Sequence, residues 1–599
     1  MNMNPFLLTD FYKLTHILQY RPELRELTSY LTPRGSRIKG IDKVVFFGLS
    51  AYVHSYVVKN FNDNFFNRNF EYCECEIREV LELGLGYSDE MIDKTINAFR
   101  ALHELQYLPV EINAVAEGTL VPMGVPCVEI KSTNPQFFWV GQALEASLSA
   151  AIWHPMVSAT IAREYRKIAR GAFSATVENG IDERTAMCDF SMRGQESNES
   201  AVNASVAWLT SMWNSSTVAA RKHIKDIYTK LSTRDKMSNS IIRGLTSTEH
   251  SVMTSHACLD GGDEIPTFKY MFDLYKNVSF AAVCDSYHFW NVLTNILPNN
   301  FMKEIDERGK RGVFIGVRHD SAEPVDALCG TVPVITATKV KELSDCMVDG
   351  DKKLYSISIT LEELERIRSL NVGDKVAIGG GDLVYQIYTI NRDGFGWHVT
   401  SDGGEVVWAV AYCLNRPRTW EEKGMVETMY EIFGGTVNSK GYKVLNPGIK
   451  AVYGDSITIT RAKKIYERLA AKGFAANNVS LGVGSFSFQG LENEDGTISL
   501  FSRDTFSIAV KCTHSKYCDE YGTVCERHVY KDPRGWSQKK SQRGLCQIYF
   551  DENGELTYKD EMYERDLVGK NSALIPYFKD GKEFKQNFEA IRETIDENL

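Results

Sequence analysis

Short apolar strands recur in two stretches of the chain, and each strand is followed by a polar or glycine turn and a segment of helical periodicity. The two stretches are residues 183–327 and 450–511, with RGVFIGVRHDS and NVSLGVGSFSF among the strands and their turns. Buried strands that alternate with helices are typical of an α/β barrel, whose functional residues follow the carboxyl ends of the strands. We therefore predict an α/β barrel built from two separate pieces of sequence.

Three of these strands end in an Asp-Ser pair, at Asp285, Asp320 and Asp455. The carboxyl ends of all strands in such a barrel meet at one rim, so the three carboxylates are predicted to share the mouth of the barrel. Carboxylates in such a place suit the binding of hydroxyl groups or of a divalent cation.

The remaining sequence patterns divide the chain into five segments. They are an N-terminal β-rich flanking segment with connecting helices (1–180), the first part of the barrel (181–330), a β-rich insertion (331–419), the second part of the barrel (420–511) and a C-terminal segment that returns to the flanking domain (512–599). Alternating apolar and polar residues over 108–130 predict antiparallel strands, whereas spacings of three and four over 134–177 predict helices. A charged helix is expected from Lys582 onward.

Charge and hydropathy exclude several classes of protein. The net charge of -10 is spread along the chain without a basic block, which argues against nucleic acid or a membrane surface as the main partner. The first apolar run lacks a preceding basic region and is soon interrupted by Asp10, so we expect no signal peptide. The most apolar window, 143–162, contains Glu145, His154 and Pro155 and is expected to be a buried helix. The 13 cysteines are expected to be reduced thiols of a cytoplasmic protein.

Several motifs suit a transferase that moves a ribosyl 5-phosphate, although each alone also has an ordinary structural explanation, which for Arg503 and Lys511 is the commoner one, a solvated charge. Glycines in Leu481–Ser485 would allow a phosphate to approach the backbone. Arg503 and Lys511 stand on either side of a predicted strand and suit a polyanion. Phe190 could stack on a heteroaromatic ring and Arg193 could bind phosphate.

Nine segments in register carry a resemblance along nearly the whole chain except the insertion. They are TDFYKLTHILQY, FSMRGQES, STEHS, CDSYHFWN, RHDS, NSKGYK followed by AVYGDS, LGVGS, RDTFSIAVKC and YKDP. In this order they resemble the segments of the nicotinamide phosphoribosyltransferases. The resemblance implies an α/β barrel of the type II phosphoribosyltransferases with a β-rich flanking domain, in a homodimer whose active sites lie at the subunit interface. It also implies nicotinamide and phosphoribosyl pyrophosphate as substrates, Mg2+ as cofactor and ATP as a stimulatory co-substrate.

The resemblance further implies a role for each site residue. Phe190 would stack on one face of the pyridine ring and Tyr12 of the partner subunit on the other, with Arg193 and Asp10 at the border of the base pocket. Asp285 and Asp320 would hold ribose hydroxyls or Mg2+, with Arg318 on the pyrophosphate side. Gly454, Asp455, Gly482 and Gly484 would line the ribose phosphate, and Arg503 and Lys511 would neutralise phosphates. His250 matches the histidine that family members phosphorylate from ATP.

Two departures from the family pattern leave alternatives open. Ser216 stands where the family has an aspartate that accepts from the nicotinamide amide, so nicotinate phosphoribosyltransferase activity is the second hypothesis. The insertion has no family counterpart, and it could cap the site or add an oligomer contact.

Two other classes of function fit the sequence less well. A non-catalytic binding protein on the same scaffold would have lost the charged ligands, which are present. A Schiff-base aldolase, using Lys450 or Lys511, would leave the pyridine slot unexplained.

Overall fold

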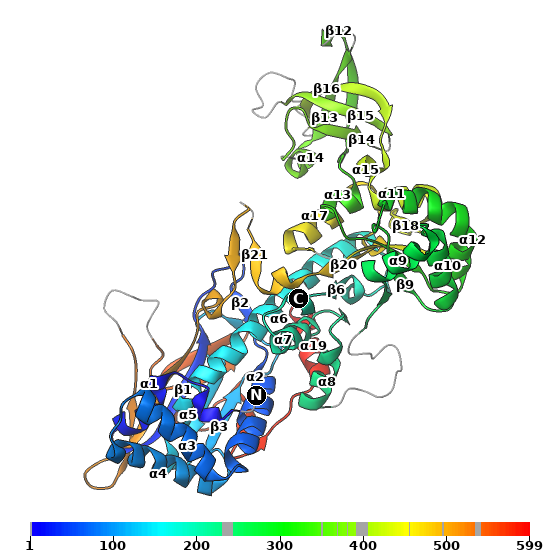
Figure 1. Ribbon diagram of the computed structural model, residues 1–599. Helices are drawn as coiled ribbons and strands as arrows, with labels where there is room; N and C mark the ends of the chain where they lie inside the picture. The colour runs from blue at the N-terminus through cyan, green and yellow to red at the C-terminus, as the bar shows by residue number, and fades with distance from the viewer. Residues whose placement is uncertain are drawn as a thin grey trace.

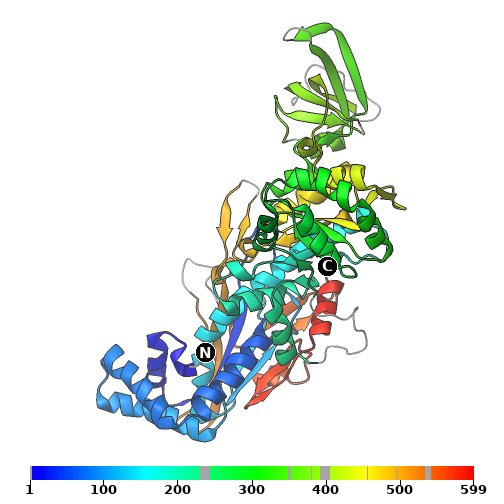
Figure 2. The ribbon, with the colours of Figure 1, turned by 45° about the vertical axis from the view of Figure 1, so that its right-hand side comes forward.

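The chain folds into a barrel, a flanking region beside it and a small β-rich unit that projects from its other side (Figures 1 and 2). The computed structural model describes residues 3–229, 243–348, 352–367, 369–379, 381–390, 405–454, 456–493, 496–532 and 541–599.

Seven parallel strands form the barrel. Their order is β7 (Asn214–Ser215), β6 (Met187–Asp189), β20 (Val479–Val483), β19 (Ile449–Tyr453), β10 (Ile315–His319), β9 (Phe280–Val283) and β8 (Thr246–Ser247). A parallel bridge between Asn214 and Arg243 joins the edge strand β7 to the segment that leads into β8, the other edge. The sheet thus curls back on itself, and the predicted α/β barrel from two pieces of sequence is confirmed.

Helix α17 (Ile459–Ala471) illustrates how the sequence forms the outer layer of the barrel. Its buried residues Ala462, Ile465, Tyr466 and Leu469 recur at spacings of three and four, which places them on one face. Thr458 caps the helix by accepting a hydrogen bond from the Arg461 amide. The helix therefore starts directly at the end of the loop that follows β19 and runs away from that end of the barrel.

The flanking region combines the two ends of the chain in one sheet. Its order is β24 (Val524–His528), β23 (Ile508–Cys518), β1 (Leu24–Pro33), β5 (Val128–Ser132), β3 (Val110–Ala114), β27 (Ile575–Lys579) and β28 (Lys582–Glu583). The predicted antiparallel strands in 108–130 are confirmed: β3 pairs with β5, and β4 (Leu120–Pro122) pairs in antiparallel fashion with β2 (Lys43–Val45).

The helix predicted from Lys582 was placed too early. Lys582 and Glu583 pair with β27, and the helix α19 runs over Phe588–Glu597 after the capping residue Asn587. Strand pairing within the sheet overrides the charged helical pattern at these first residues.

Helix α6 (Glu145–Thr176) connects the flanking region to the barrel. It contains most of the apolar window, and Pro155 lies inside it among buried neighbours, as predicted for a buried helix. Within the described part of the chain, no helix combines the length and apolar character that a membrane crossing requires.

The insertion forms a six-stranded sheet with a core of its own. The order is β11 (Val334–Ile335), β14 (Lys375–Ile378), β15 (Leu383–Ile390), β16 (Glu405–Pro417), β13 (Lys352–Thr360) and β12 (Lys339–Val348). At its base, Lys472 donates to the carbonyl of Lys423 at 2.8 Å, and Arg468 donates to the carbonyl of Gly330 at 3.2 Å. Both cations lie at the end of α17 remote from the strand ends, so the insertion does not cap the barrel mouth of its own chain.

Glu422 links the insertion to α15 (Trp420–Lys423) and predicts a pH dependence of stability. Its carboxylate accepts from both Arg416 terminal nitrogens, at 2.6 and 2.7 Å, and these hydrogen bonds lower the pKa of Glu422 to about 2. A depressed pKa stabilises the fold above the ordinary value of 4.5 and stops doing so as the pH falls toward 2. We expect Glu422→Gln to lower the melting temperature by about 2–4 °C at pH 6 and by progressively less below pH 4.5. A difference that does not change with pH would contradict this assignment.

Candidate active site

The carboxyl ends of the barrel strands gather most of the predicted site residues at one rim. Phe190 follows β6, Ser216 follows β7, His250 lies beyond β8, Asp285 lies beyond β9, Arg318 and Asp320 lie at the end of β10, Gly454 follows β19, and Gly482 and Gly484 lie at the end of β20. Arg193 is exposed in the short helix η7 (Met192–Gly194), near Phe190. Asp455 lies outside the described residues.

Asp285 is the best-supported carboxylate of the rim. Its side chain is only 4% exposed. The Asp320 amide donates to Asp285 Oδ2 at 2.8 Å and the Ser321 hydroxyl donates at 2.5 Å, while His319 Nδ1 lies 3.4 Å from the same oxygen. Burial opposes ionisation, but the hydrogen bonds from His319, Ser321 and the Asp320 amide together hold the pKa of Asp285 well below its ordinary value. Asp285 is therefore a fixed negative charge at neutral pH.

Arg318 and Asp320 form the adjoining part of the rim. Arg318 donates to the Ser247 hydroxyl at 3.0 Å, and its other terminal nitrogen lies 3.4 Å from Asp320 Oδ2. Three buried polar atoms here, Asp285 Oδ1, Asp320 Oδ1 and Arg318 Nε, have no hydrogen-bond partner among the described residues. Buried polar groups normally have partners, so these atoms are suited to a ligand. Two carboxylate oxygens fit Mg2+, and the guanidinium fits a phosphate.

His250 begins helix α9 (His250–Ala257) with its side chain 47% exposed. Its Nδ1 lies 3.1 Å from the Ser286 hydroxyl, and its Nε2 lies 3.9 Å from Asp285 Oδ1. The imidazole thus reaches the unpartnered oxygen of Asp285 and remains accessible from solvent.

Glycine is required at two positions of the rim by close packing. A Cβ on Gly454 would lie 2.5 Å from Asp320 Oδ1 and 3.0 Å from Arg318 Cδ. A Cβ on Gly482 would lie 2.5 Å from the Gly454 carbonyl oxygen and 2.7 Å from Phe190 Cδ2. Because neither glycine has a side chain, Phe190, Asp320 and Arg318 can pack closely around these two adjacent strand ends.

Asp189 is a site residue that the sequence reasoning missed. Its fully buried carboxylate accepts from the Ser191 amide and the Ser215 hydroxyl, each at 2.8 Å, and from the Ser205 hydroxyl. The Ser216 amide donates to the Asp189 carbonyl at 2.9 Å. Asp189 thereby fixes the backbone that carries Phe190 and the backbone that carries Ser216. Its position at the end of a buried strand could have indicated a site residue. Its hydrogen-bond partners Ser205 and Ser215 lie on other elements, so the sequence did not reveal its role.

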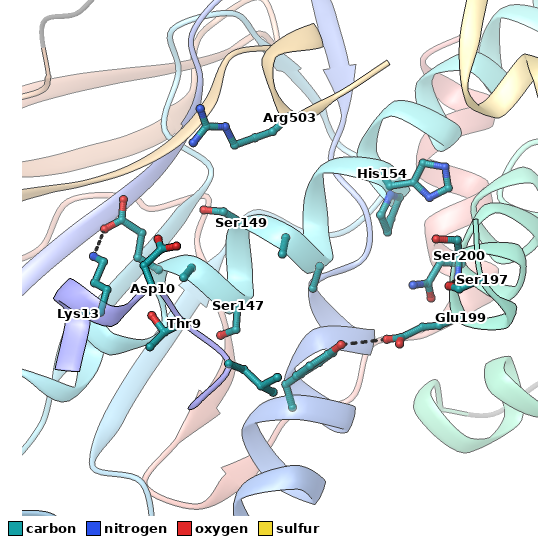
Figure 3. Close-up of a pocket in the computed structure, with 18 of the residues that line it drawn as sticks. Thr9, Asp10, Lys13, Ser147, Ser149, His154, Ser197, Glu199, Ser200 and Arg503 are labelled. Atoms are coloured by element: carbon teal, nitrogen blue, oxygen red, sulfur yellow. Dashed lines mark hydrogen bonds and ion pairs between the residues drawn. The ribbon is translucent and has the colours of Figure 1, made fainter. Parts of the chain in front are cut away.

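Three other predicted binding residues line a separate cleft. Asp10, Tyr12 and Arg503 belong to a cleft of about 580 Å³ between α1 (Phe11–Gln19), α6 and α7 (Asn198–Trp208). Figure 3 shows Asp10, Lys13 and Arg503 toward one side and His154 and Glu199 toward the other. Phe190, Arg193, Asp285, Arg318 and Asp320 are not among the described residues that line it.

Lys511 is not among the described residues that line this cleft, but it contacts one of them, Glu145. Its Nζ lies 3.5 Å from Glu145 Oε1, while Lys13 Nζ lies 2.5 Å from Glu145 Oε2. Burial lowers the pKa of Lys511, although Glu145 opposes that shift. Arg503 lies just before strand β23 of the flanking sheet and Lys511 lies in that strand, and their role toward the phosphates stays a prediction.

Comparisons with known proteins identify the family of this chain. Residues 185–553 match the model of the nicotinate phosphoribosyltransferase family, and residues 4–77 match the N-terminal domain of nicotinamide phosphoribosyltransferase. A nicotinamide phosphoribosyltransferase of Acinetobacter baylyi is 27% identical, over 100% of this chain and 98% of the relative. One of Mycoplasma pneumoniae is 24% identical, over 92% and 98%. The crystal structure of human nicotinic acid phosphoribosyltransferase has a TM-score of 0.46 and 14% identity, over 98% of this chain and 93% of that chain. Because the first of these family matches spans more than half of the sequence, the chain belongs to the nicotinate phosphoribosyltransferase family.

Proposed function

We propose that this enzyme is a nicotinamide phosphoribosyltransferase, which joins nicotinamide to phosphoribosyl pyrophosphate and releases nicotinamide mononucleotide and pyrophosphate for NAD salvage. The observation that carries the proposal is the rim itself. An ionised Asp285, Asp320 and the Arg318 guanidinium lie beside two glycine strand ends. Each of the three side chains has one buried polar atom without a partner among the described residues. Relatives that align over 100% and 92% of the chain are named for the same activity.

The reaction breaks the bond between ribose C1 and the pyrophosphate oxygen and forms a bond from C1 to the pyridine nitrogen. The ribose becomes oxocarbenium-like as pyrophosphate departs, so positioning and electrostatics supply most of the rate and no covalent nucleophile is needed. Asp285 would favour the developing positive charge and hold ribose hydroxyls, and Arg318 would neutralise the leaving pyrophosphate. Phe190 would orient the ring for attack.

Asp285 and Asp320 are the proposed ligands of Mg2+, and His250 is the proposed site of phosphorylation from ATP. The unpartnered Oδ1 atoms of Asp285 and Asp320 would hold Mg2+, which offsets the negative charge of pyrophosphate when bound. Phosphorylation of the exposed His250 from ATP would add about -1.5 to -2 charges beside the rim. Detection of phosphohistidine after incubation with ATP tests that part separately.

The cleft would complete the site from a second subunit. Tyr12 is 56% exposed at the cleft, which gives it a free aromatic face. Arg503 and Lys511 would bring positive charge to a polyanion bound at the rim of the other subunit. We therefore propose a homodimer in which the rim of one chain faces the cleft of its partner.

The direct experiment supplies purified enzyme with phosphoribosyl pyrophosphate, Mg2+ and either nicotinamide or nicotinate, with and without ATP, and follows the mononucleotide. The proposal expects product from nicotinamide. Product from nicotinate alone would replace the proposal with nicotinate phosphoribosyltransferase activity, and no product from either base would refute both.

Ser216 predicts how the choice of base can be changed. Its exposed side chain follows β7 at the rim, in the chain fixed by Asp189. A carboxylate at this position would repel nicotinate, so Ser216→Asp should raise the preference for nicotinamide over nicotinate at least about tenfold in kcat/KM. The neutral variant Ser216→Asn should leave the ratio near that of the wild type. Equal effects of both variants would show that charge at this position does not select the base.

A further inference from the structure

One buried hydroxyl outside the barrel connects the two glycine strand ends of the rim. Tyr165 lies on α6 and is 0% exposed. Its hydroxyl donates to the Ile457 carbonyl at 2.8 Å and lies 2.7 Å from the Ser487 hydroxyl. Ile457 follows Gly454 by three residues, and Ser487 follows Gly484 by three residues. The phenol therefore bridges the segments that leave β19 and β20.

The bridge is built as a buried donor and acceptor chain. With the Tyr165 hydroxyl donating to Ile457, its oxygen accepts from Ser487, and the Ser487 hydroxyl lies a further 3.4 Å from the same Ile457 carbonyl. Burial raises the pKa of the Tyr165 phenol, so the hydroxyl keeps the proton that it donates. Without the hydroxyl, the Ile457 carbonyl would retain only the longer contact to Ser487, and buried polar groups left without partners are unfavourable.

The segment after Gly484 is held from two further directions. His154, also on α6, has its Nε2 3.1 Å from the Phe488 carbonyl. Gln489 donates to the Gly194 carbonyl at 2.7 Å, which ties the segment to the loop that carries Phe190 and Arg193. The helix η11 (Ser485–Phe488) is thus fixed to α6 on one side and to the base-pocket loop on the other. Tyr165 provides the shorter of the two side-chain hydrogen bonds that link the Ile457 carbonyl to that frame.

We propose that Tyr165 is a positioning residue for the ribose 5-phosphate of phosphoribosyl pyrophosphate. The inference rests on the proposed function, because Gly454, Gly482 and Gly484 are the positions expected to line that phosphate. Tyr165 sets the spacing of the two glycine segments from outside the barrel and does not touch the substrate. Loss of its hydroxyl releases Ile457, on the Gly454 side, whereas the base-pocket loop keeps its own tie through Gln489. The effect is therefore expected on the phosphate-bearing substrate and not on the aromatic base.

The experiment compares Tyr165→Phe with Tyr466→Phe. Tyr466 is a matched control, since it is also buried, lies on α17, and its hydroxyl has no hydrogen-bond partner among the described residues. The ring of Tyr165 packs edge-on against Trp208, with centroids 5.5 Å apart, and phenylalanine keeps that contact. We expect Tyr165→Phe to raise the KM for phosphoribosyl pyrophosphate about threefold to tenfold, with the KM for nicotinamide unchanged. Tyr466→Phe should leave both constants unchanged.

Calorimetric titration and a double variant with Ser487→Ala test the role of Tyr165 independently of the choice of base. Calorimetric titration of each variant with phosphoribosyl pyrophosphate should show the same loss of affinity, even if the base used by the enzyme proves to be nicotinate. Ser487→Ala should weaken the same binding, and the double variant should lose less than the product of the two single effects, because both side chains belong to one network. Unchanged affinity in Tyr165→Phe, or equal losses for base and phosphoribosyl pyrophosphate, would overturn the inference. Tight calorimetric binding without mononucleotide formation would count against the proposed function instead.

Discussion

Asp285→Asn is expected to lower kcat/KM for mononucleotide formation by about 10²- to 10³-fold. The substitution keeps the shape of the side chain and removes the negative charge that three neighbouring groups hold in place. An amide cannot stabilise a cationic ribose or a metal ion as a carboxylate does, and its NH2 group would face donors. The measurement is steady-state kinetics with both substrates varied, together with thermal unfolding to establish that the variant remains folded.

Asp326→Asn is the matched control for this charge removal. Asp326 lies on α13 (Pro324–Cys329), close in sequence to the rim, and pairs with Arg468 at 2.7 Å. Losing that partly exposed ion pair should leave kcat/KM near that of the wild type. A loss of less than about tenfold in Asp285→Asn, against an unchanged control, would remove Asp285 from the catalytic centre.

Gly482→Ala is expected to lower kcat/KM by about 10²-fold, because the added methyl group must displace either the Gly454 carbonyl or the Phe190 ring. Either shift misplaces a group that the proposed mechanism uses, the phosphate-binding backbone or the ring that orients the base. The same substitution at Gly171, in α6, meets no atom within 4 Å and should be neutral or slightly stabilising.

Kinetic and structural measurements can separate the two effects of the methyl group. A crystal structure of Gly482→Ala should show Phe190 or Gly454 displaced from its wild-type position. Full activity in a folded Gly482→Ala variant would mean that the close approach of these strand ends is not needed for catalysis.

The sequence predicted those features of the fold that depend on local pattern. Strands followed by polar turns and helices indicated the barrel and the rim position of Asp285 and Asp320, since parallel strands bring their carboxyl ends to one edge. Local pattern failed at Lys582, where pairing with a strand distant along the chain decides the structure. Local pattern also did not show where the insertion lies relative to the barrel mouth. That position depends on the contacts that Arg468 and Lys472 make at the base of the insertion.

Contacts between distant elements account for the site residues that were missed or misplaced. Asp189 acquires its role from Ser205 and Ser215, and Tyr165 acquires its role from Ile457 and Ser487. Neither partnership follows from residue type or spacing. Lys511 pairs within the flanking sheet and Arg503 lines the cleft, and this placement also depends on pairing with a distant strand.

The central claim is that the rim of one subunit and the cleft of another form one site for nicotinamide mononucleotide synthesis. Its most direct test mixes two inactive variants, Asp285→Asn in the rim and Tyr12→Ala in the cleft, after subunit exchange, and measures mononucleotide formation. In a twofold dimer, half of randomly mixed dimers contain both variants, and each of these has one intact site, so about a quarter of wild-type activity should return. If the mixture stays as inactive as its separate components while subunit exchange is demonstrated, the shared site is wrong.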